Sequence, residues 1–380
     1  MNYLIIGGGP TGLSAAWALQ KEDPNARITL LEKTDRLGGW VQTSHEKGLL
    51  FEKGPRTFQL ARSPHLLQLA QELGLELLFS DPSAQKRFLW HKGKLRSTSS
   101  FFFSLAPYLL KEMFIPKGLE EDESIYEFAC RRFSPKIAEL LFDPLTLGIY
   151  GGDIKKLSLR SCFPSLYSWE REKGSITKGL FSSRSQKKGL FTFKGGVETL
   201  ISTLERRLNM EVVLNCSSSS AQDLVYQADR VIDARPPSLP KKSLWVVHLA
   251  YEEELFTKGF GYLVPSKEGL SLLGMIFDSV IFPSQGPSHI LRLSAMIREE
   301  ETHPEEKAIY FAKHHLKLRS EPLFTQSFFA KEALLQPEVG LHYRGGVSLD
   351  SAIERGFCLA QRQTSSNDER LIKPMKSSLE

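Results

Sequence analysis

A glycine-rich turn between an apolar strand and a helix near the start of the chain constrains the fold more than any other feature. An apolar run at Tyr3–Ile6 leads into the turn, small and apolar residues follow at Leu13–Lys21, and a second apolar run at Arg27–Leu31 ends on Glu32. The turn itself consists of Gly7, Gly8, Gly9, Pro10, Thr11 and Gly12. A glycine pattern in this setting predicts a dinucleotide-binding unit.

Each glycine of the pattern has its own physical reason. Gly7 permits the tight turn, Gly9 lets the backbone approach a pyrophosphate, and Gly12 lets the helix and the strand pack closely. The unpaired N–H groups at the helix N-terminus then face the phosphates. Glu32 lies where a carboxylate accepts hydrogen bonds from the ribose hydroxyls of the adenosine.

The residues after Glu32 favour FAD over NAD as the dinucleotide. Lys33, Arg36, Gly38, Gly39 and Trp40 extend the unit to E-K-x-x-R-x-G-G-W. This extension resembles flavoproteins of the glutathione reductase type and their amine oxidase-like relatives, in which a basic residue and a glycine pair continue the dinucleotide site. A second glycine turn and a cation suit a long FAD laid across the sheet edge, so we expect these residues to belong to the cofactor site.

Length and composition set broader limits. At 380 residues the chain exceeds one ordinary domain, and its 49 basic and 44 acidic residues leave a formal charge of +5. That charge suits anionic lipid or a carboxylated substrate, and we expect no nucleic-acid partner. The four cysteines lie far apart, and His314 and His315 are adjacent rather than spaced as ligands, so we expect a reducing compartment and no metal site. No apolar stretch approaches the roughly 20 residues of a membrane span.

Patterning predicts several further elements. Ser63 and Pro64 are expected to supply the cap and first turn of a helix at Ser63–Leu73, and Arg87–Leu95 is expected to form a hairpin with a Lys-Gly turn. The polar and charged stretch Ala360–Glu380 is predicted to be a disordered tail.

Two stretches bring a closer resemblance. Leu49–Phe58 reads L-L-F-E-K-G-P-R-T-F, and Asp143–Phe181 contains three turn glycines and the run S-L-R-S-x-F-P-x-L. Together with the N-terminal unit they resemble the family of oxygen-dependent protoporphyrinogen oxidases and coproporphyrinogen oxidases, flavoenzymes of haem synthesis. The resemblance implies a loop beside the flavin ring that consists of Gly54, Pro55, Arg56 and Thr57. From the residues alone, Arg56 is a turn residue whose guanidinium is exposed to water or caps the turn.

The resemblance also implies an architecture. It is an α/β fold with a Rossmann-like FAD-binding domain of the glutathione reductase type, a mixed-sheet substrate domain and an inserted helical domain. We expect the FAD-binding domain at residues 1–80, 190–235 and 335–360, the substrate domain at 81–98 and 236–334, the helical domain at 99–189 and a flexible tail at 361–380. Further cofactor contacts are implied for the backbone of Val213, which also fits core packing, and for Val347, Ser348 and Leu349.

Four positions are implied to line the substrate cavity. In the family, the arginine of a hairpin like Arg87–Leu95 faces a propionate of the tetrapyrrole, which gives Arg87 a charge-assisted contact. Gly261 and Leu263, in G-F-G-Y-L-V-P-S, would clamp a pyrrole face, and Met296 would line the wall beside the flavin. By pattern alone, Leu263 and Met296 are core residues and Arg87 is exposed to water.

The apolar stretch Ser99–Phe114 has two interpretations. It is too short, and too interrupted by Pro107, to span a bilayer, so it forms either a buried core helix or an interfacial helix. The resemblance favours the second, with a cytoplasmic protein that makes a peripheral contact on the inner face of the cell membrane. The sequence is compatible with either a monomer or a homodimer.

The resemblance implies FAD-dependent oxidation of protoporphyrinogen IX to protoporphyrin IX, with hydride passing to the flavin and O2 reduced to H2O2. Coproporphyrinogen III is the alternative substrate. Two rivals are an amine or carotenoid-type flavin oxidoreductase and a degenerate relative that binds FAD or porphyrin without turnover. The degenerate relative is suggested by shortened segments after Glu338 and Asp233, and by Arg298-Glu299 where the family has Gly-Gly. No protein acid or base is required, because the cofactor carries the chemistry.

Overall fold

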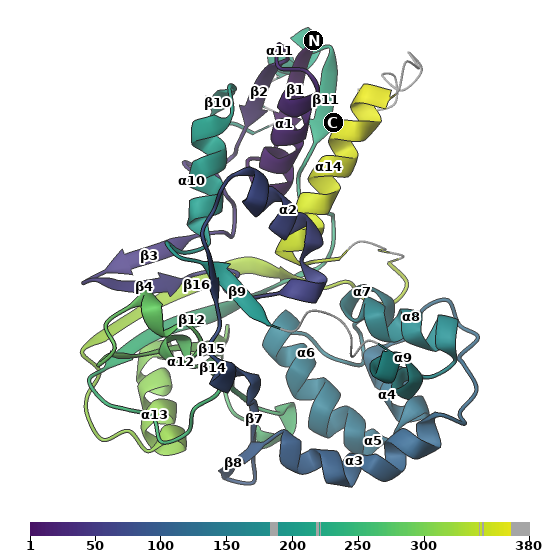
Figure 1. Cartoon of the computed structure of the whole chain (residues 1–380), viewed down its shortest axis with the longest axis vertical. Coiled ribbons are helices and arrows are strands. Elements are labelled where there is room, and N and C mark those ends of the chain that lie inside the picture. Colours follow the sequence, from purple (N-terminus) through teal and green to yellow (C-terminus); the bar gives the residue numbers. More distant parts are fainter. Residues whose placement is uncertain (183–188, 218–219, 221, 342, 344–345, 366–380) are drawn as a thin grey trace.

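The computed structural model describes residues 1–182, 189–217, 220, 222–341, 343 and 346–365. Figure 1 shows three parts: a parallel sheet with its helices at one end, a large mixed sheet beneath it, and a group of helices beside the large sheet. The first and last segments of the chain meet in the first part, where the N-terminal strand and the final helix lie close together (Figure 1).

The parallel sheet forms where the glycine pattern predicts it. Its order is β10-β2-β1-β11, and every neighbouring pair is parallel. The bounds are Asn2–Ile6 for β1, Arg27–Leu31 for β2, Glu211–Val213 for β10 and Arg230–Asp233 for β11. Alternate residues such as Tyr3 and Ile5 face a core shared with helices α1 (Pro10–Glu22) and α10 (Glu198–Arg207), while Leu4 and Ile6 face α11 (Gln222–Gln227).

The final helix, α14 (Leu349–Ser365), packs along α1 and α2 (Pro64–Glu72). A residue of α14 caps the start of α2, although the two are far apart in the sequence. The Asp350 carboxylate accepts a 2.8 Å hydrogen bond from the Leu66 N–H and lies 3.2 Å from Nδ1 of His65. Ser63 makes no side-chain cap bond. Ser63 and Pro64 therefore occupy the predicted cap and first-turn positions, but a cap bond from the Ser63 side chain is wrong, because the Asp350 carboxylate accepts the helix N–H instead.

The tail prediction is also wrong at its start. The helix α14 continues through Ala360 to Ser365, because Ile353 and Ala360 are buried in the core of the parallel-sheet part and hold its apolar face in place. Residues 366–380 lie outside the described residues.

The mixed sheet has the strand order β16-β12-β15-β14-β13-β7-β8. In chain order its strands are β7 (Phe88–His91), β8 (Lys94–Ser97), β12 (Lys241–Tyr251), β13 (Gly261–Leu263), β14 (Leu272–Ile276), β15 (Leu291–Arg298) and β16 (Phe324–Leu335). Helix α13 (Pro304–Leu316) covers one face through a core that includes Val247, Leu249 and Ala295. The predicted Lys-Gly turn is confirmed: Lys92 and Gly93 both have positive φ between β7 and β8.

Two short sheets connect the two larger ones. The hairpin β3 (Thr43–Glu46) and β4 (Leu49–Glu52) packs Phe51 against Ala250 of β12. The second short sheet has the order β5-β9-β6, from β5 (Phe58–Gln59), β9 (Leu190–Phe193) and β6 (Leu77–Phe79). These strands carry the chain between the parallel sheet and the rest of the molecule.

The helical part contains α3 (Ser99–Glu112), α4 (Ile125–Arg132), α6 (Asp143–Tyr150), α7 (Leu159–Cys162), α8 (Pro164–Lys173) and α9 (Ile176–Ser182). A short α5 (Pro135–Ile137) and a π-helical stretch, η3 (Ala138–Phe142), lead into α6. Among the described residues, no helix is both long enough and apolar enough to cross a membrane.

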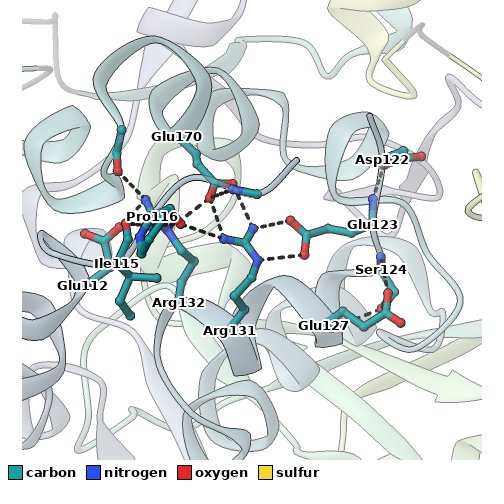
Figure 2. Close-up of polar contacts among 12 residues, drawn as sticks. Glu112, Ile115, Pro116, Asp122, Glu123, Ser124, Glu127, Arg131, Arg132 and Glu170 are labelled. Carbon is teal, nitrogen blue, oxygen red and sulfur yellow. Dashed lines mark hydrogen bonds and ion pairs between the residues drawn. The ribbon is translucent and has the colours of Figure 1, made fainter. Parts of the chain in front are cut away.

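Buried ion pairs hold these helices together (Figure 2). The Glu112 carboxylate at the end of α3 lies 2.9 Å from Arg132 Nη2, with both side chains fully buried. Burial alone raises the pKa of Glu112, but hydrogen bonds from Ser175, Thr177 and the Ile176 N–H outweigh it and bring the pKa below its usual range. Arg131 bridges Glu123 and Glu170 beside this pair (Figure 2).

Breaking this buried pair is expected to be costly. Glu112→Gln leaves the Arg132 guanidinium without its full counter-charge, so we expect the free energy of unfolding to fall by about 3–5 kcal/mol in urea titrations near pH 7. Because the pKa of Glu112 is lowered on folding, the stability it contributes is present above its unfolded pKa and is lost as pH falls. Glu120→Gln, at an exposed position, is the matched control. A loss below about 1 kcal/mol for Glu112→Gln would contradict this account.

Candidate cofactor and substrate site

The turn between β1 and α1 has the geometry of a phosphate cradle. A Cβ on Gly12 would lie 1.9 Å from the Gly7 carbonyl oxygen, so only glycine allows α1 to start this close to β1. At Gly9, which caps α1 without a side chain, a Cβ would meet nothing within 4 Å. The first turn of α1 therefore opens onto free space, where its unpaired N–H groups and positive dipole end suit an anion.

Glu32 lies at the carboxyl end of β2 and is buried. Its carboxylate accepts hydrogen bonds from the Gly8 N–H at 2.8 Å and from the Thr34 N–H at 2.9 Å, while its own N–H donates to the Val213 carbonyl at 2.9 Å. These contacts place Val213 directly beside the acidic residue. Lys33 is exposed next to it.

Arg36 organises the second glycine turn. Its guanidinium donates to the carbonyls of Gly39 and Val41, each at 2.9 Å, and forms a 2.9 Å ion pair with Glu198 at the start of α10. The second turn lies against the first, because the Gly38 N–H donates to the Gly8 carbonyl at 2.8 Å. Arg36 therefore shapes the cradle by holding its backbone.

The loop Gly54–Thr57 continues the same path towards the mixed sheet. A Cβ on Gly54 would lie 1.8 Å from the Trp40 carbonyl oxygen, so the loop presses directly on the second glycine turn. Pro55 is half-buried. The buried Thr57 hydroxyl has no hydrogen-bond partner among the described residues and borders a cavity of about 10 Å³, enough for about one water molecule.

The start of α14 closes the other side of the cradle. Ser348 caps the helix, since its hydroxyl accepts the Ser351 N–H at 3.1 Å, and Val347 and Leu349 flank it. Farther along, a Cβ on Gly356 would lie 2.4 Å from the Thr11 carbonyl oxygen, so α14 crosses α1 at closest approach. The C-terminal helix therefore reaches the first turn of α1 through Gly356, seven residues after Leu349.

A buried polar chain joins this cradle to the mixed sheet. Arg56 donates to the Glu52 carbonyl at 3.0 Å and lies 3.3 Å from the Asp278 carboxylate. The Ser294 hydroxyl donates to the same carboxylate at 2.6 Å and lies 2.9 Å from Nδ1 of His248. The chain therefore runs from the cradle loop through α12 (Asp278–Ile281) to β15 and β12.

The contacts of His248 fix its tautomer. Burial, with the charges of Arg56 and Lys53, holds the pKa of His248 well below its usual range, so the ring is neutral. Because the Ser294 hydrogen points to Asp278, the proton of His248 sits on Nδ1 and Nε2 is an acceptor. Nε2 has no partner among the residues described here, and the ring stacks on Phe51 at 4.7 Å.

Glu52 is a second buried titrating group at this junction. Its carboxylate accepts the Val197 N–H at 2.8 Å and the Thr43 hydroxyl at 2.8 Å. Burial raises the pKa of Glu52 to about 7, although these hydrogen bonds and Arg56 oppose the rise. Around neutral pH, Glu52 is therefore partly protonated in the folded chain.

The predicted substrate positions lie on one face of the mixed sheet, opposite α13. Strand register aligns Leu263 with Gly274, Met296, Val246 and Phe328 in one row across neighbouring strands. Paired residues in such a ladder project to the same side. The middle of this face is therefore apolar, as the resemblance implied for Leu263 and Met296.

A second row of paired residues lies beside the apolar row on the same face, and it has polar residues at both ends. Gly261 pairs with Ile276, and the row continues through Ser294 to His248. Arg87 directly precedes β7, two residues from Leu89, and strand alternation places it on the same face. Its guanidinium lies 4.5 Å above the Phe260 ring. The structure thus brings Arg87, Gly261, Leu263 and Met296 to one surface.

Helix α6 partly covers this surface. A Cβ on Gly148 would lie 2.3 Å from a Leu263 methyl group, so the small residue lets α6 approach β13. Leu145 and Ile149 are exposed and lie about 60° and 100° around the helix from Gly148. Trp40, also exposed, packs edge-on to Phe328 at the far end of the apolar row. Large apolar side chains therefore border the face on two sides.

A dinucleotide cradle that leads through one loop to an apolar sheet face defines an FAD-dependent oxidoreductase of the α/β class. The open backbone at Gly9 and the second glycine turn beside it fit the phosphate part of FAD. Comparison with known proteins agrees. Residues 10–232 match the family of flavin-containing amine oxidoreductases.

Similar proteins narrow the family. Protoporphyrinogen oxidase of Homo sapiens is 32% identical over 78% of this chain and 77% of its own length. Coproporphyrinogen III oxidase of Bacillus subtilis is 33% identical over 56% of this chain and 52% of its own. A crystal structure described as a putative protoporphyrinogen oxidase from Exiguobacterium superimposes with a TM-score of 0.80 at 21% identity, covering 95% and 98% of the two chains. The chain belongs to the flavin-containing amine oxidoreductases, in the group that includes the protoporphyrinogen and coproporphyrinogen III oxidases.

Several residues of the site were not predicted from the sequence. Glu52, Asp278, Ser294 and His248 are spread over the chain, and nothing in their spacing links them. One signal was available, because Glu52 and Asp278 are acidic residues inside otherwise apolar runs. Buried carboxylates of this kind usually have a charged or hydrogen-bonded partner.

The raised pKa of Glu52 predicts a pH-dependent stability. Because the folded-state pKa of about 7 exceeds the ordinary 4.5, the free energy of unfolding falls as pH rises between these values. A side-chain amide at this position would resemble the protonated carboxyl. Glu52→Gln should therefore gain stability over the wild type by up to about 3 kcal/mol at pH 8 and by little at pH 5, measured by urea unfolding.

Glu46→Gln, an exposed position on the paired strand β3, is the control and should gain nothing. If Glu52→Gln and the wild type lose stability in parallel between pH 5 and 8, Glu52 does not titrate in this range.

Proposed function

We propose that this protein oxidises a porphyrinogen, with protoporphyrinogen IX as substrate, protoporphyrin IX as product, O2 as the electron acceptor and H2O2 released. This activity belongs to haem and porphyrin biosynthesis. The observation that carries the proposal is the continuity between the FAD cradle and the apolar row of Leu263, Gly274 and Met296, with Arg87 at its edge. A flat apolar ring that bears carboxylates suits such a surface.

In this proposal the cofactor site consists of the two glycine turns, Glu32, the Gly54–Thr57 loop and the start of α14. FAD supplies the acceptor for electrons from the substrate C–H bonds and passes them to O2. Leu263 and Met296 hold the macrocycle by apolar contact, and α6 with Leu145 and Ile149 limits access of water. Arg87 binds a propionate through a charge-assisted hydrogen bond.

The relatives support protoporphyrinogen over coproporphyrinogen III as the substrate. The human protoporphyrinogen oxidase matches 78% of this chain, whereas the B. subtilis coproporphyrinogen III oxidase matches 56%. Coproporphyrinogen III carries more propionates and would demand more cations around the face than Arg87. Coproporphyrinogen III oxidation is therefore the second candidate.

A direct assay tests the proposal. The FAD-loaded protein is mixed in air with each porphyrinogen in turn, and porphyrin fluorescence and H2O2 are followed together. We expect both to rise, with the higher kcat/KM for protoporphyrinogen. Full flavin loading without either signal would show a binding protein without turnover, and a higher kcat/KM for coproporphyrinogen would reverse the choice of substrate.

Arg87→Ala should raise KM for the porphyrinogen by about ten- to a hundred-fold, because a hydrogen bond between charged groups contributes roughly 1.5–3 kcal/mol. Flavin content and kcat should change little, since Arg87 is not part of the cradle. Lys86→Ala removes a neighbouring exposed cation and should leave KM unchanged. An unaltered KM in Arg87→Ala would remove this residue from the substrate site.

We also propose a peripheral membrane contact through the end of α3, in a cytoplasmic protein. Leu110, Phe114 and Leu119 are 65%, 86% and 91% exposed, and Lys111 and Lys117 lie between them. Apolar side chains with flanking lysines suit an anionic bilayer surface. The proposal includes a homodimer as an alternative to a monomer, and light scattering of the same preparation would distinguish the two.

Flotation with vesicles tests this contact. The wild type should float with vesicles of phosphatidylcholine and phosphatidylglycerol, and Leu110→Ser with Phe114→Ser should reduce the bound fraction several-fold without altering flavin content. Tyr226→Ser, an exposed aromatic residue on α11, is the matched control. Equal flotation of the double variant and the wild type would exclude this surface.

A further inference from the structure

Arg355 of α14 reaches the start of the dinucleotide helix. Its Nη2 donates to the Thr11 hydroxyl at 3.0 Å and lies 3.4 Å from the Arg235 carbonyl, just after β11. The guanidinium thus connects the first turn of α1 with the segment that follows β11. Neither the glycine pattern nor the C-terminal sequence points to this arginine.

The position of Arg355 is fixed by packing. The neighbouring residue, Gly356, is the point where α14 touches α1, with a Cβ position only 2.8 Å from the Ser14 Cβ and 3.0 Å from the Ala15 N. Thr11 is itself almost fully buried. The helix contact at Gly356 fixes the backbone from which Arg355 extends, and the buried Thr11 hydroxyl is a fixed partner for its guanidinium.

Arg355 shares its neighbouring carboxylate with a second arginine. The Asp233 carboxylate interacts with the charge of Arg355, but a 2.7 Å ion pair already joins this carboxylate to Arg235. Side-chain and backbone hydrogen bonds from Arg235, and the charge of Arg355, outweigh burial and hold the pKa of Asp233 below its usual range. Two arginines therefore face this carboxylate, and Arg355 is the one whose guanidinium also contacts the first turn of α1. Arg355 also interacts with Tyr343. Burial raises the pKa of the Tyr343 hydroxyl, whereas the charge of Arg355 and a hydrogen bond with it lower that pKa.

The hydrogen bond to Thr11 also orients its hydroxyl. Because Thr11 Oγ1 accepts a hydrogen from Arg355, its own hydrogen must point elsewhere. Thr11 is the second residue of α1, next to the open space at Gly9. A hydroxyl donor, unpaired helix N–H groups and a guanidinium therefore lie together at this end of the cradle, and phosphate oxygens accept from all three.

We propose that Arg355 binds the pyrophosphate of FAD from the C-terminal helix, both through its guanidinium and by orienting the Thr11 hydroxyl towards the phosphate. The proposal rests on FAD as the cofactor and is independent of which porphyrinogen is oxidised. It makes α14 part of the cofactor site over two helical turns, beyond the residues at its start.

Binding measurements on the full-length protein stripped of flavin test this role. Arg355→Met should weaken FAD binding about ten- to a hundred-fold in titrations followed by flavin fluorescence, because it removes a charge-assisted contact. ADP should lose a similar factor as a competitor of FAD, whereas adenosine, which lacks the pyrophosphate, should compete as before. Thr11→Val should show the same ADP-selective pattern with a smaller loss. Raised salt should weaken FAD binding less in Arg355→Met than in the wild type.

Arg362→Met, on the same helix, is the matched control and should bind FAD as the wild type does. Circular dichroism of each variant checks the fold, and Thr11→Val provides the test if Arg355→Met does not fold. An FAD affinity within twofold of wild type in Arg355→Met, or equal losses for ADP and adenosine, would overturn the proposal. None of these readouts depends on porphyrinogen turnover.

Discussion

The close approach of α1 to β1 at Gly12 is the contact on which the site depends. With a Cβ position 1.9 Å from the Gly7 carbonyl, this crossing allows no other residue, and it directs the helix N-terminus at the sheet edge. The second glycine turn rests on the first through Gly38, and the Gly54 loop rests on the second through Trp40. Each piece of the cradle is thus positioned by backbone contact with the one before it, and the side chains of Glu32 and Arg36 hold the two turns through their backbone groups.

Polar side chains then connect the cradle to the sheet that carries the substrate face. The chain from Arg56 through Asp278 and Ser294 to His248 is buried, and burial strengthens each of its hydrogen bonds while making an unpaired member costly. This arrangement fixes the cradle loop relative to β12 and β15. The apolar row through Met296 and the cofactor path are therefore held in one relative position by charges rather than by packing alone.

Sequence reasoning predicted the parts of this molecule that depend on local geometry. The glycine turn, the bounds of β2 and the Lys-Gly hairpin follow from backbone requirements that neighbouring residues reveal. It missed what long-range contacts decide: Asp350 rather than Ser63 supplies the side-chain hydrogen bond at the start of α2, and β16 was not anticipated although it forms an edge of the mixed sheet. Arg36 was expected at the cofactor, yet its guanidinium binds carbonyls of its own turn, a choice that only the folded backbone determines.

The docking of α14 against α1 and α2 has a consequence for how the chain acquires its structure. The helices α1 and α2 are synthesised long before α14, which begins only at Leu349. Yet α14 covers the apolar side of α1 and supplies the carboxylate that caps α2. At typical rates of synthesis this gap is on the order of tens of seconds, during which the nucleotide-binding unit is incomplete. Until α14 has been made, α1 lacks its long helical neighbour and α2 lacks its carboxylate cap.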